Sequence, residues 1–226
     1  MMRNDGDSDM KEGRVARRQR RNREALIRAA SDVMSEKGID AATMLEIADR
    51  ADVGAGTVYN YFRSKDDLAI AVLEEIMQGL ALRVEAATMG FDDPAHVYAV
   101  ALMTVLETAT TDTRWRQLLN RSGIVADVMY RRIGPFTIDL LTRAAGSGRL
   151  SPGDPALAWK MSTHAIVGFG LAVTRRDMSA VSIPNAASRL LCLAGLEAAE
   201  AEELVTRPRP TLPPDTMPEG TGGAEH

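Results

Sequence analysis

Residues 43–68 read TMLEIADRADVGAGTVYNYFRSKDDL, and this stretch decides the fold. Thr43 with Glu46 three positions later is the pattern of a capping box, and apolar residues follow at helical spacing. A three-residue turn at 52–54 ends in Gly54, where we expect unusual backbone dihedrals, and leads to a second short helix over about 55–61. Two short helices joined by such a turn predict a helix-turn-helix.

The glycines at 54 and 56 also match the start of a dinucleotide-binding loop. In that motif a third glycine stands where this chain has Tyr59, and the preceding segment is a strand, whereas here it has a helical pattern. The helix-turn-helix interpretation is therefore favoured over a phosphate-cradling loop.

The second short helix carries groups that suit a groove of DNA. Ala55 and Gly56 leave its first turn nearly bare, and Thr57 can contact a base edge or a phosphate. The hydroxyl groups of Tyr59 and Tyr61 can reach the sugar-phosphate backbone. The alternative is that both tyrosines are core residues, since aromatic side chains at this spacing often are.

The same stretch resembles the DNA-binding signature of the tetracycline-repressor (TetR) family, through Thr43, Ile47-Ala48, Val53-Gly54, Gly56-Thr57, Tyr59, Tyr61-Phe62, Ser64-Lys65 and Leu68. The resemblance implies contacts with DNA from Thr43, Gly54, Ala55, Gly56, Thr57, Tyr59, Asn60, Tyr61 and Lys65. Family members often place Ser and then Lys or Arg where this chain has Gly54 and Ala55. The arginine-rich segment between Arg14 and Arg23 could compensate through phosphate or minor-groove contacts.

Charge is distributed unevenly along the 226 residues, whose net charge is −4. Residues 11–28 contain eight Lys or Arg and two acidic residues, which suggests contact with a polyanion. A solvated helix start would explain the same charges. The single cysteine suits a reducing compartment, and we find neither a signal peptide nor a long apolar run. We therefore expect a cytoplasmic protein without a membrane partner.

Helical patterns continue along the chain, and no strand pattern is found, so the predicted class is all-α. We predict helices over about 19–37, 43–51, 55–61, 64–88, 94–110, 113–128, 130–145, 154–175 and 185–205. The predicted domains are a basic flexible arm (1–18), a helix-turn-helix DNA-binding domain (19–65), a helical ligand-binding and dimerisation domain (66–205) and a disordered tail (206–226), whose composition cannot bury a core.

The resemblance implies a ligand pocket among the variable helices and a homodimer formed through the last two helices. The helix 154–175 is apolar on more than one face, which agrees with burial by several neighbours. Candidate pocket residues offer aromatic, flexible or polar groups, although each could simply be core: Met77, Met103, Trp115, Tyr130, Trp159 and His164. The chemistry of the effector does not follow from the sequence.

Catalysis finds no support in the sequence. His96, His164 and His226 lack the spacing of metal ligands, and Cys192 lies in an apolar helical run. We therefore expect no metal, no cofactor and no enzymatic activity. The predicted function is a regulator, of which a repressor is the favoured form, that binds a palindromic double-stranded operator as a dimer and is released by a small-molecule effector. The alternatives are a helical ligand-binding or scaffold protein with a weak DNA head, and an enzyme that uses the helical pocket.

Overall fold

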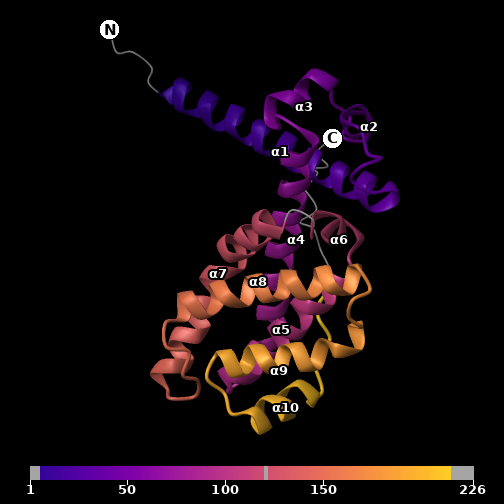
Figure 1. Cartoon of the computed structure of the whole chain (residues 1–226). Coiled ribbons are helices and arrows are strands. Elements are labelled where there is room, and N and C mark those ends of the chain that lie inside the picture. The colour runs from indigo at the N-terminus through magenta and orange to yellow at the C-terminus, as the bar shows by residue number, and fades with distance from the viewer. Residues whose placement is uncertain (1–5, 120–121, 215–226) are drawn as a thin grey trace. The chain divides into compact units, whose positions relative to one another are not determined.

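The computed structural model describes residues 6–119 and 122–214, and every regular element in these ranges is a helix (Figure 1). The predicted all-α class is confirmed. The chain forms two compact units that divide between Val72 and Leu73, within α4 (Lys65–Thr88). The division lies slightly beyond residue 65, where the sequence places the end of the DNA-binding domain.

The first unit is a small helical head. It contains α1 (Gly6–Lys37), α2 (Met44–Arg50), α3 (Ala55–Tyr61) and the first two turns of α4. The head has a single core to which each helix contributes apolar side chains at helical spacing. The buried apolar residues are Leu26, Ile27, Ala29, Ala30, Val33, Met34, Ile39, Ala42, Ile47, Ala48, Val58, Phe62, Leu68, Ala69, Ala71 and Val72.

The first helix is longer than predicted. We expected a flexible arm up to residue 18, whereas α1 begins at Gly6. The apolar periodicity used for the prediction starts only near Ala25, but the Arg, Gln and Ala residues before it have high helix propensity. The basic segment is therefore a helical extension of α1, and residues 1–5 lie outside the described residues.

The second unit is built around α5 (Pro94–Thr111), of whose 18 residues 12 are buried, so this helix lies in the middle of the bundle. Helices α7, α8, α9 and α10 all contact it. The surrounding elements are α6 (Thr113–Leu118), α7 (Ser122–Gly146), α8 (Pro155–Thr174), a short 3-10 helix (Ala180–Ser182), α9 (Ile183–Leu193) and α10 (Ala198–Thr206).

Two predicted helices of the second unit are divided differently in the structure. The predictions 113–128 and 130–145 are wrong at their shared boundary, because α6 ends at Leu118 and α7 runs from Ser122 through Pro135 without a break. The predicted helix 185–205 is interrupted between α9 and α10 at Gly195, whose φ of +87° is left-handed. A Cβ at this position would lie 2.3 Å from the carbonyl oxygen of Ser151.

Helix α8 is long and apolar enough to cross a membrane by length and composition, which we did not expect from the sequence. In the structure its side chains alternate between burial and exposure. Trp159, Ile166, Val167 and Phe169 are buried in the bundle. The same length and composition are found in core helices of folded domains, and α8 packs as one of these.

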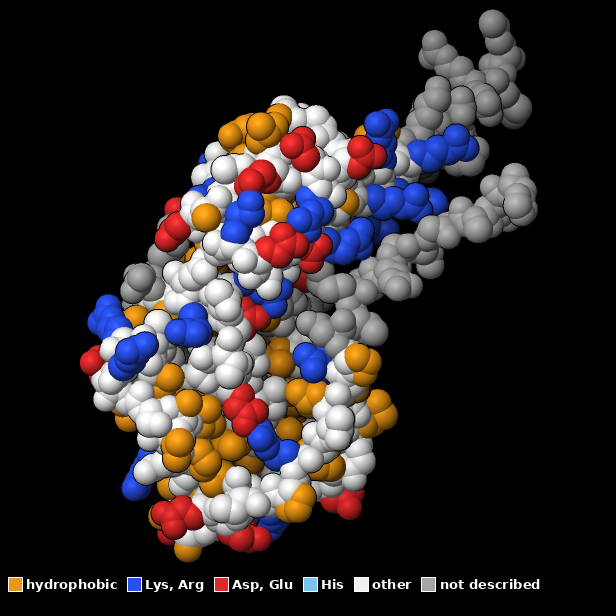
Figure 2. Space-filling view, turned by 90° about the vertical axis from the view of Figure 1, so that its right-hand side faces the viewer, with side chains coloured by type: hydrophobic (Ala, Val, Ile, Leu, Met, Phe, Trp, Pro, Cys, Tyr) orange, Lys and Arg blue, Asp and Glu red, His pale blue; other side chains and the backbone are white. Residues whose placement is uncertain are grey.

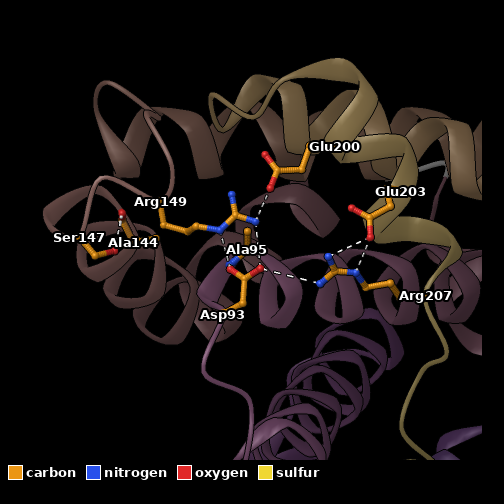
Figure 3. Close-up of polar contacts among 8 residues, drawn as sticks. All are labelled: Asp93, Ala95, Ala144, Ser147, Arg149, Glu200, Glu203 and Arg207. Carbon is orange, nitrogen blue, oxygen red and sulfur yellow. Dashed lines mark hydrogen bonds and ion pairs between the residues drawn. The ribbon is translucent and has the colours of Figure 1, made fainter.

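A network of ion pairs joins distant parts of the second unit (Figure 3). Asp93 caps α5, and its carboxylate accepts two hydrogen bonds from Arg149, of 2.8 and 2.9 Å. Arg149 also pairs with Glu200 of α10 at 2.7 Å. Burial alone would raise the pKa of Asp93, but the bonds from Arg149 and from the backbone of Ala95 outweigh it and lower that pKa. This contribution to stability is therefore present at neutral pH and lost as the pH falls through the lowered pKa.

The chain continues beyond α10 as an extended segment, residues 207–214, which is held by specific contacts. Arg207 pairs with Glu203 at 3.0 Å, and Arg209 pairs with Glu107 of α5 at 2.7 Å. The Arg83 side chain of α4 donates to the carbonyl oxygen of Pro213 at 2.7 Å. Residues 207–214, which we expected to belong to a disordered tail, thus contact α4, α5 and α10. Residues 215–226 lie outside the described residues.

Replacing Gly195 with Ala is expected to destabilise the second unit. The new methyl group would meet the Ser151 backbone, and the left-handed conformation adds strain, so we expect the free energy of unfolding to fall by more than about 2 kcal/mol. Urea unfolding followed by tryptophan fluorescence measures this, since Trp115 and Trp159 both lie in this unit.

The matched control is Gly123→Ala, because a Cβ there has no neighbouring atom within 4 Å. This helical position should gain up to about 1 kcal/mol. Equal stability of the Gly195→Ala variant and the wild type would contradict the close contact between the α9–α10 turn and the α7–α8 loop.

Candidate nucleic-acid interface and ligand cavity

Helix α3 is held in the head by two side chains. Val58 is fully buried and Phe62, which caps the helix, is 5% exposed. The guanidinium of Arg23 on α1 lies 5.4 Å from the centre of the Phe62 ring, a cation–π distance. Both side chains therefore face the core of the head. A helix of seven residues is marginal alone, so these contacts fix its orientation.

The opposite face of α3 is open to solvent. Ala55, Gly56 and Asn60 are exposed, and Tyr59 has 59% of its surface exposed. A Cβ at Gly56 would have no neighbouring atom within 4 Å, so another large surface can approach the backbone there. The interpretation of Tyr59 as a core residue is wrong, and its exposure agrees with the predicted groove-facing role.

Thr57 and Tyr61 lie at the edges of this face and are each half-buried. Tyr61 is therefore partly packed and partly open to solvent. It is neither the core residue nor the fully exposed DNA-contacting residue that the two sequence interpretations describe. Its contact with DNA stays a prediction, as do those of the other residues on α3.

The turn between α2 and α3 differs from the prediction in one respect. Gly54 has an ordinary extended conformation, with φ −65°, and serves as the N-cap of α3. The left-handed residue of the turn is Asp52, with φ +53°. Aspartate tolerates this conformation better than most residues. A Cβ at Gly54 would lie 3.8 Å from the Thr57 hydroxyl, so a side chain can be accommodated there.

The predicted capping box at the start of α2 is present. The backbone N–H of Glu46 donates to the Thr43 hydroxyl oxygen at 3.2 Å, and the backbone N–H of Thr43 donates to the Glu46 carboxylate at 3.1 Å. The Thr43 hydroxyl itself donates to that carboxylate at 2.9 Å. Thr43 is exposed, so the predicted phosphate contact would compete with Glu46 for its hydroxyl proton.

Lys65 opens α4 and its ammonium group donates to the carbonyl oxygen of Asp40 at 2.7 Å. This bond ties α4 to the segment between α1 and α2. The sequence alone did not indicate this structural role, because the two residues are 25 positions apart. Contact between Lys65 and DNA stays a prediction.

Two further basic residues of the head also form ion pairs. Lys37 pairs with Glu46 at 2.6 Å, and Arg50 makes two parallel bonds of 3.0 Å to Glu36. Hydrogen bonds from Arg50 and from Lys37 lower the pKa values of Glu36 and Glu46, respectively. These ion pairs bring together residues from α1 and α2, and they extend the ionised range of both carboxylates to lower pH.

The second unit contains a cavity of about 440 Å³ between the end of α4, the start of α5 and the second half of α7. This volume is in the range of small-molecule sites. Aromatic and aliphatic side chains form much of the wall: Met89, Phe91, Pro94, Val97, Phe136 and Leu140. The polar lining consists of Glu85, Thr88, Asp92, Arg143 and Ser147.

The polar groups of the cavity mostly accept hydrogen bonds. The hydroxyls of Thr88 and Ser147 donate their own protons to backbone carbonyls, at 2.8 and 3.0 Å, so their lone pairs remain available. Glu85 and Asp92 contribute carboxylates. Arg143 pairs with Asp139 at 2.9 Å through its Nε and keeps further N–H donors on its guanidinium. The cavity therefore offers acceptors from four side chains and donors from one, beside an apolar wall.

The six pocket residues predicted from the sequence do not line this cavity. Met77, Met103, Trp115 and Trp159 are buried in the second unit. Tyr130 has the ammonium group of Lys160 at 4.7 Å from its ring, and His164 is exposed. The six remain untested as ligand contacts.

Two of these candidates carry an unusual polar group. The indole nitrogens of Trp115 and Trp159 are buried and have no hydrogen-bond partner. Unpaired buried donors are rare and cost free energy. The indole of Trp159 lies against α7, where a Cβ on Gly134 would be 3.3 Å from its nitrogen. Among the described residues, no group of three His, Cys, Asp or Glu side chains could hold a metal ion.

Comparison with known families gives two matches that together cover most of the chain. A model described as "Bacterial regulatory proteins, tetR family" matches residues 26–72, which contain α2, α3 and the start of α4. A model described as "Tetracyclin repressor-like, C-terminal domain" matches residues 93–207, which contain α5 to α10.

Curated relatives match over part of the chain. The transcriptional repressor BepR of Brucella suis is 32% identical over 99 residues, 41% of this chain and 44% of BepR. The transcriptional repressor KstR of Mycobacterium tuberculosis is 43% identical over 61 residues, 27% of each chain. The chain thus spans less than half the length of these relatives.

A solved structure matches over a longer range. The crystal structure of RolR in complex with resorcinol has a TM-score of 0.78 and 28% sequence identity. The match covers 88% of this chain and all of the RolR chain. The similarity therefore extends through both compact units.

Proposed function

This chain belongs to the TetR family of bacterial regulatory proteins, and we propose that it is a ligand-responsive transcriptional regulator, in the form of a repressor. It binds a palindromic DNA operator as a homodimer in the cytoplasm, and a small molecule releases it. The single observation that carries this proposal is the geometry of α3, which is anchored by Val58 and Phe62 while its opposite face is bare and exposed.

Two heads would read the two half-sites of the operator. In a two-fold dimer the reading helices must match half-sites about 34–36 Å apart along the duplex. Helix α4 belongs to both compact units, so a change in the second unit can alter the spacing of the heads. The effector releases the DNA only to the extent that it binds more tightly to the dimer whose heads do not match the half-sites than to the dimer whose heads do.

Removal of the tyrosine hydroxyls is expected to weaken operator binding without unfolding the head. The doubly substituted variant Tyr59→Phe/Tyr61→Phe loses two hydrogen bonds to phosphate, and we expect its affinity to fall roughly tenfold or more. Gel-shift titration with DNA flanking the protein's own gene measures this, with thermal unfolding to verify the fold.

Tyr130→Phe is the matched control, since it removes the same group from the second unit. Unchanged affinity of the Tyr59→Phe/Tyr61→Phe variant would contradict the assigned contacts. Absence of DNA binding by the wild type at low salt would instead favour a ligand-binding or scaffold protein.

The proposed dimer uses α8 together with α9. Leu157 and Met161 of α8 have 57% and 50% of their surface exposed, and Ala165 and Gly168 continue the same exposed stripe. Large apolar side chains on a helix that also packs in the core are typical of an interface between subunits. Gly168 would allow close approach of a partner helix, because no atom lies within 4 Å of a Cβ there.

The substitution Met161→Glu is expected to shift the protein from dimer to monomer. It would place a carboxylate in the apolar stripe of each subunit, and the two charges would be desolvated together. Sedimentation velocity measures the change, with Glu202→Gln, an exposed change on α10, as the control. A variant that remains dimeric at micromolar concentration would contradict the use of this stripe.

The proposed effector is a small aromatic molecule with two or more hydroxyl groups, bound in the cavity between α4, α5 and α7. The acceptor-rich lining supports this chemistry, and the similar protein RolR has been crystallised with resorcinol. An aromatic ring would pack between apolar walls that include Phe91 and Phe136, while its hydroxyls donate to Asp92, Glu85 or Ser147.

Resorcinol is expected to release the wild-type protein from DNA, and Phe136→Ala should require at least about tenfold more of it because an apolar wall is lost. Fluorescence polarisation of a labelled operator at increasing resorcinol concentration measures this. Glu202→Gln, an exposed change on α10 outside the cavity, is the control. If Phe136→Ala responds like the wild type, the effector binds elsewhere, and the unpaired indoles of Trp115 and Trp159 become the preferred site.

A further inference from the structure

Most of the second unit is held together by apolar contacts. Helices α5, α7, α8 and α9 pack along one another, and hydrophobic side chains (orange) gather on the face of this unit seen in Figure 2. The backbone of α4, by contrast, approaches other described helices at isolated points only. Its side chains Met77, Leu80 and Val84 are buried, but the hydrophobic effect that favours their burial is non-directional. Directional polar contacts are therefore important for the position of α4.

Two polar contacts between distant residues constrain α4 within the second unit. Close to the start of this unit, Arg132 of α7 donates to the Glu74 carboxylate at 2.6 Å. Further along α4, the Nε–H of Arg83 donates to the carbonyl oxygen of Pro213 at 2.7 Å, in a partly buried position. The first contact joins α4 to α7, whereas the second joins it to the extended segment 207–214.

Segment 207–214 reads RPRPTLPP, so half of its residues are prolines. Proline fixes φ and cannot continue a helix, and proline-rich sequences adopt an extended conformation without internal hydrogen bonds. Such a segment is already restricted before it attaches to the bundle, so its attachment loses less conformational entropy than that of an ordinary chain end. In Figure 1 it is the yellow trace that leaves α10 and runs along the second unit.

Two arginines attach this segment before it reaches α4. Arg207 pairs with Glu203 of α10 at 3.0 Å, and its guanidinium lies 4.0 Å from the Asp93 carboxylate at the start of α5 (Figure 3). Arg209 pairs with Glu107, in the last part of α5, at 2.7 Å. Both pairs are partly exposed, and such pairs contribute modestly when they are alone. Here they act on one restricted segment, which thereby connects α10, α5 and α4.

We propose that segment 207–214 holds α4 in place relative to α5 and thereby fixes the position from which α4 carries the head. The inference rests on the proposed function, in which two heads match two half-sites. From Arg83 to Lys65, the first residue of α4, the helix is about 27 Å long. At that distance a tilt of about 5° displaces the start of α4 by roughly 2 Å. A small loss of restraint at Arg83 therefore becomes a larger uncertainty in the position of the head.

A restraint on α4 acts differently on two kinds of DNA binding. Specific binding requires both heads to contact their half-sites at once, so it depends on the spacing of the heads. Non-specific binding follows the charge of the phosphates and does not need a fixed spacing. Release of segment 207–214 should therefore weaken specific binding and leave non-specific binding nearly unchanged, whereas a general loss of stability would weaken both.

The test releases the segment from two sides in the full chain. Arg83→Met removes the donor on α4 and keeps an unbranched side chain of high helix propensity, and Arg209→Gln removes the charge that pairs with Glu107. Because both changes act through one segment, their effects should not add in the double variant. The control is Arg131→Gln, an exposed change on α7 whose partner Asp127 lies on the same helix.

Hydrogen–deuterium exchange followed by mass spectrometry measures the restraint without DNA or effector. The amides of residues 73–88 are expected to exchange roughly tenfold faster in Arg83→Met and about threefold faster in Arg209→Gln, because fewer contacts oppose local opening. The double variant should resemble Arg83→Met, and the control should resemble the wild type. Unchanged exchange of α4 in both single variants would overturn the proposed restraint.

Fluorescence polarisation then measures binding to the DNA flanking the protein's own gene and to an arbitrary duplex of the same length. Arg83→Met is expected to lower affinity for the first about fivefold and for the second less than about twofold, because only the first depends on head spacing. An equal loss on both duplexes would contradict a role of segment 207–214 in head spacing. A wild-type protein that does not distinguish the duplexes would overturn the proposed operator binding, and the exchange of α4 would still decide the restraint.

Discussion

The burial of Val58 and Phe62 is the constraint on which the head depends. Helix α3 is too short to be stable alone, so its position comes from these two side chains and from the caps around it. Because one face is committed to the core, the opposite face is fixed in space and free of internal contacts. The small residues Ala55 and Gly56 then allow a close approach of another molecule, and the exposed Tyr59 projects beyond them.

The basic residues of the head fall into two groups, those with an ion-pair partner in the head and those without one. Acidic residues of α1 and α2 bind nearby cations and stabilise the arrangement of the helices, so the same cations contribute less to the attraction of a polyanion. Arg14, Arg17, Arg18 and Arg21 on the extension of α1, and Arg63 after α3, are exposed, and none of them forms an ion pair with another side chain that the structure describes.

Much of the head could be predicted because its signals are local: the capping box at Thr43 and the alternation of buried and exposed residues on α3 each depend on neighbours within a few positions. The errors concern contacts between distant residues. Nothing near Lys65 indicates that it binds Asp40, and nothing near Gly195 indicates that Ser151 will lie against it. The cavity combines three helices, and so its lining could not be read from any one of them. Helix α1 was predicted too short because periodicity detects burial, and its extension is not buried.

The contacts of the extended segment 207–214 also bear on the order in which the two units form during synthesis on the ribosome. Residues of the head are complete by Val72, so this unit can fold while the rest of the chain is still being made. The contact between Arg83 and Pro213 in the second unit forms only after 130 further residues have been synthesised. At about 5–20 residues per second, that delay is roughly 7–26 s. During synthesis the head is therefore complete before the contacts of segment 207–214 can form.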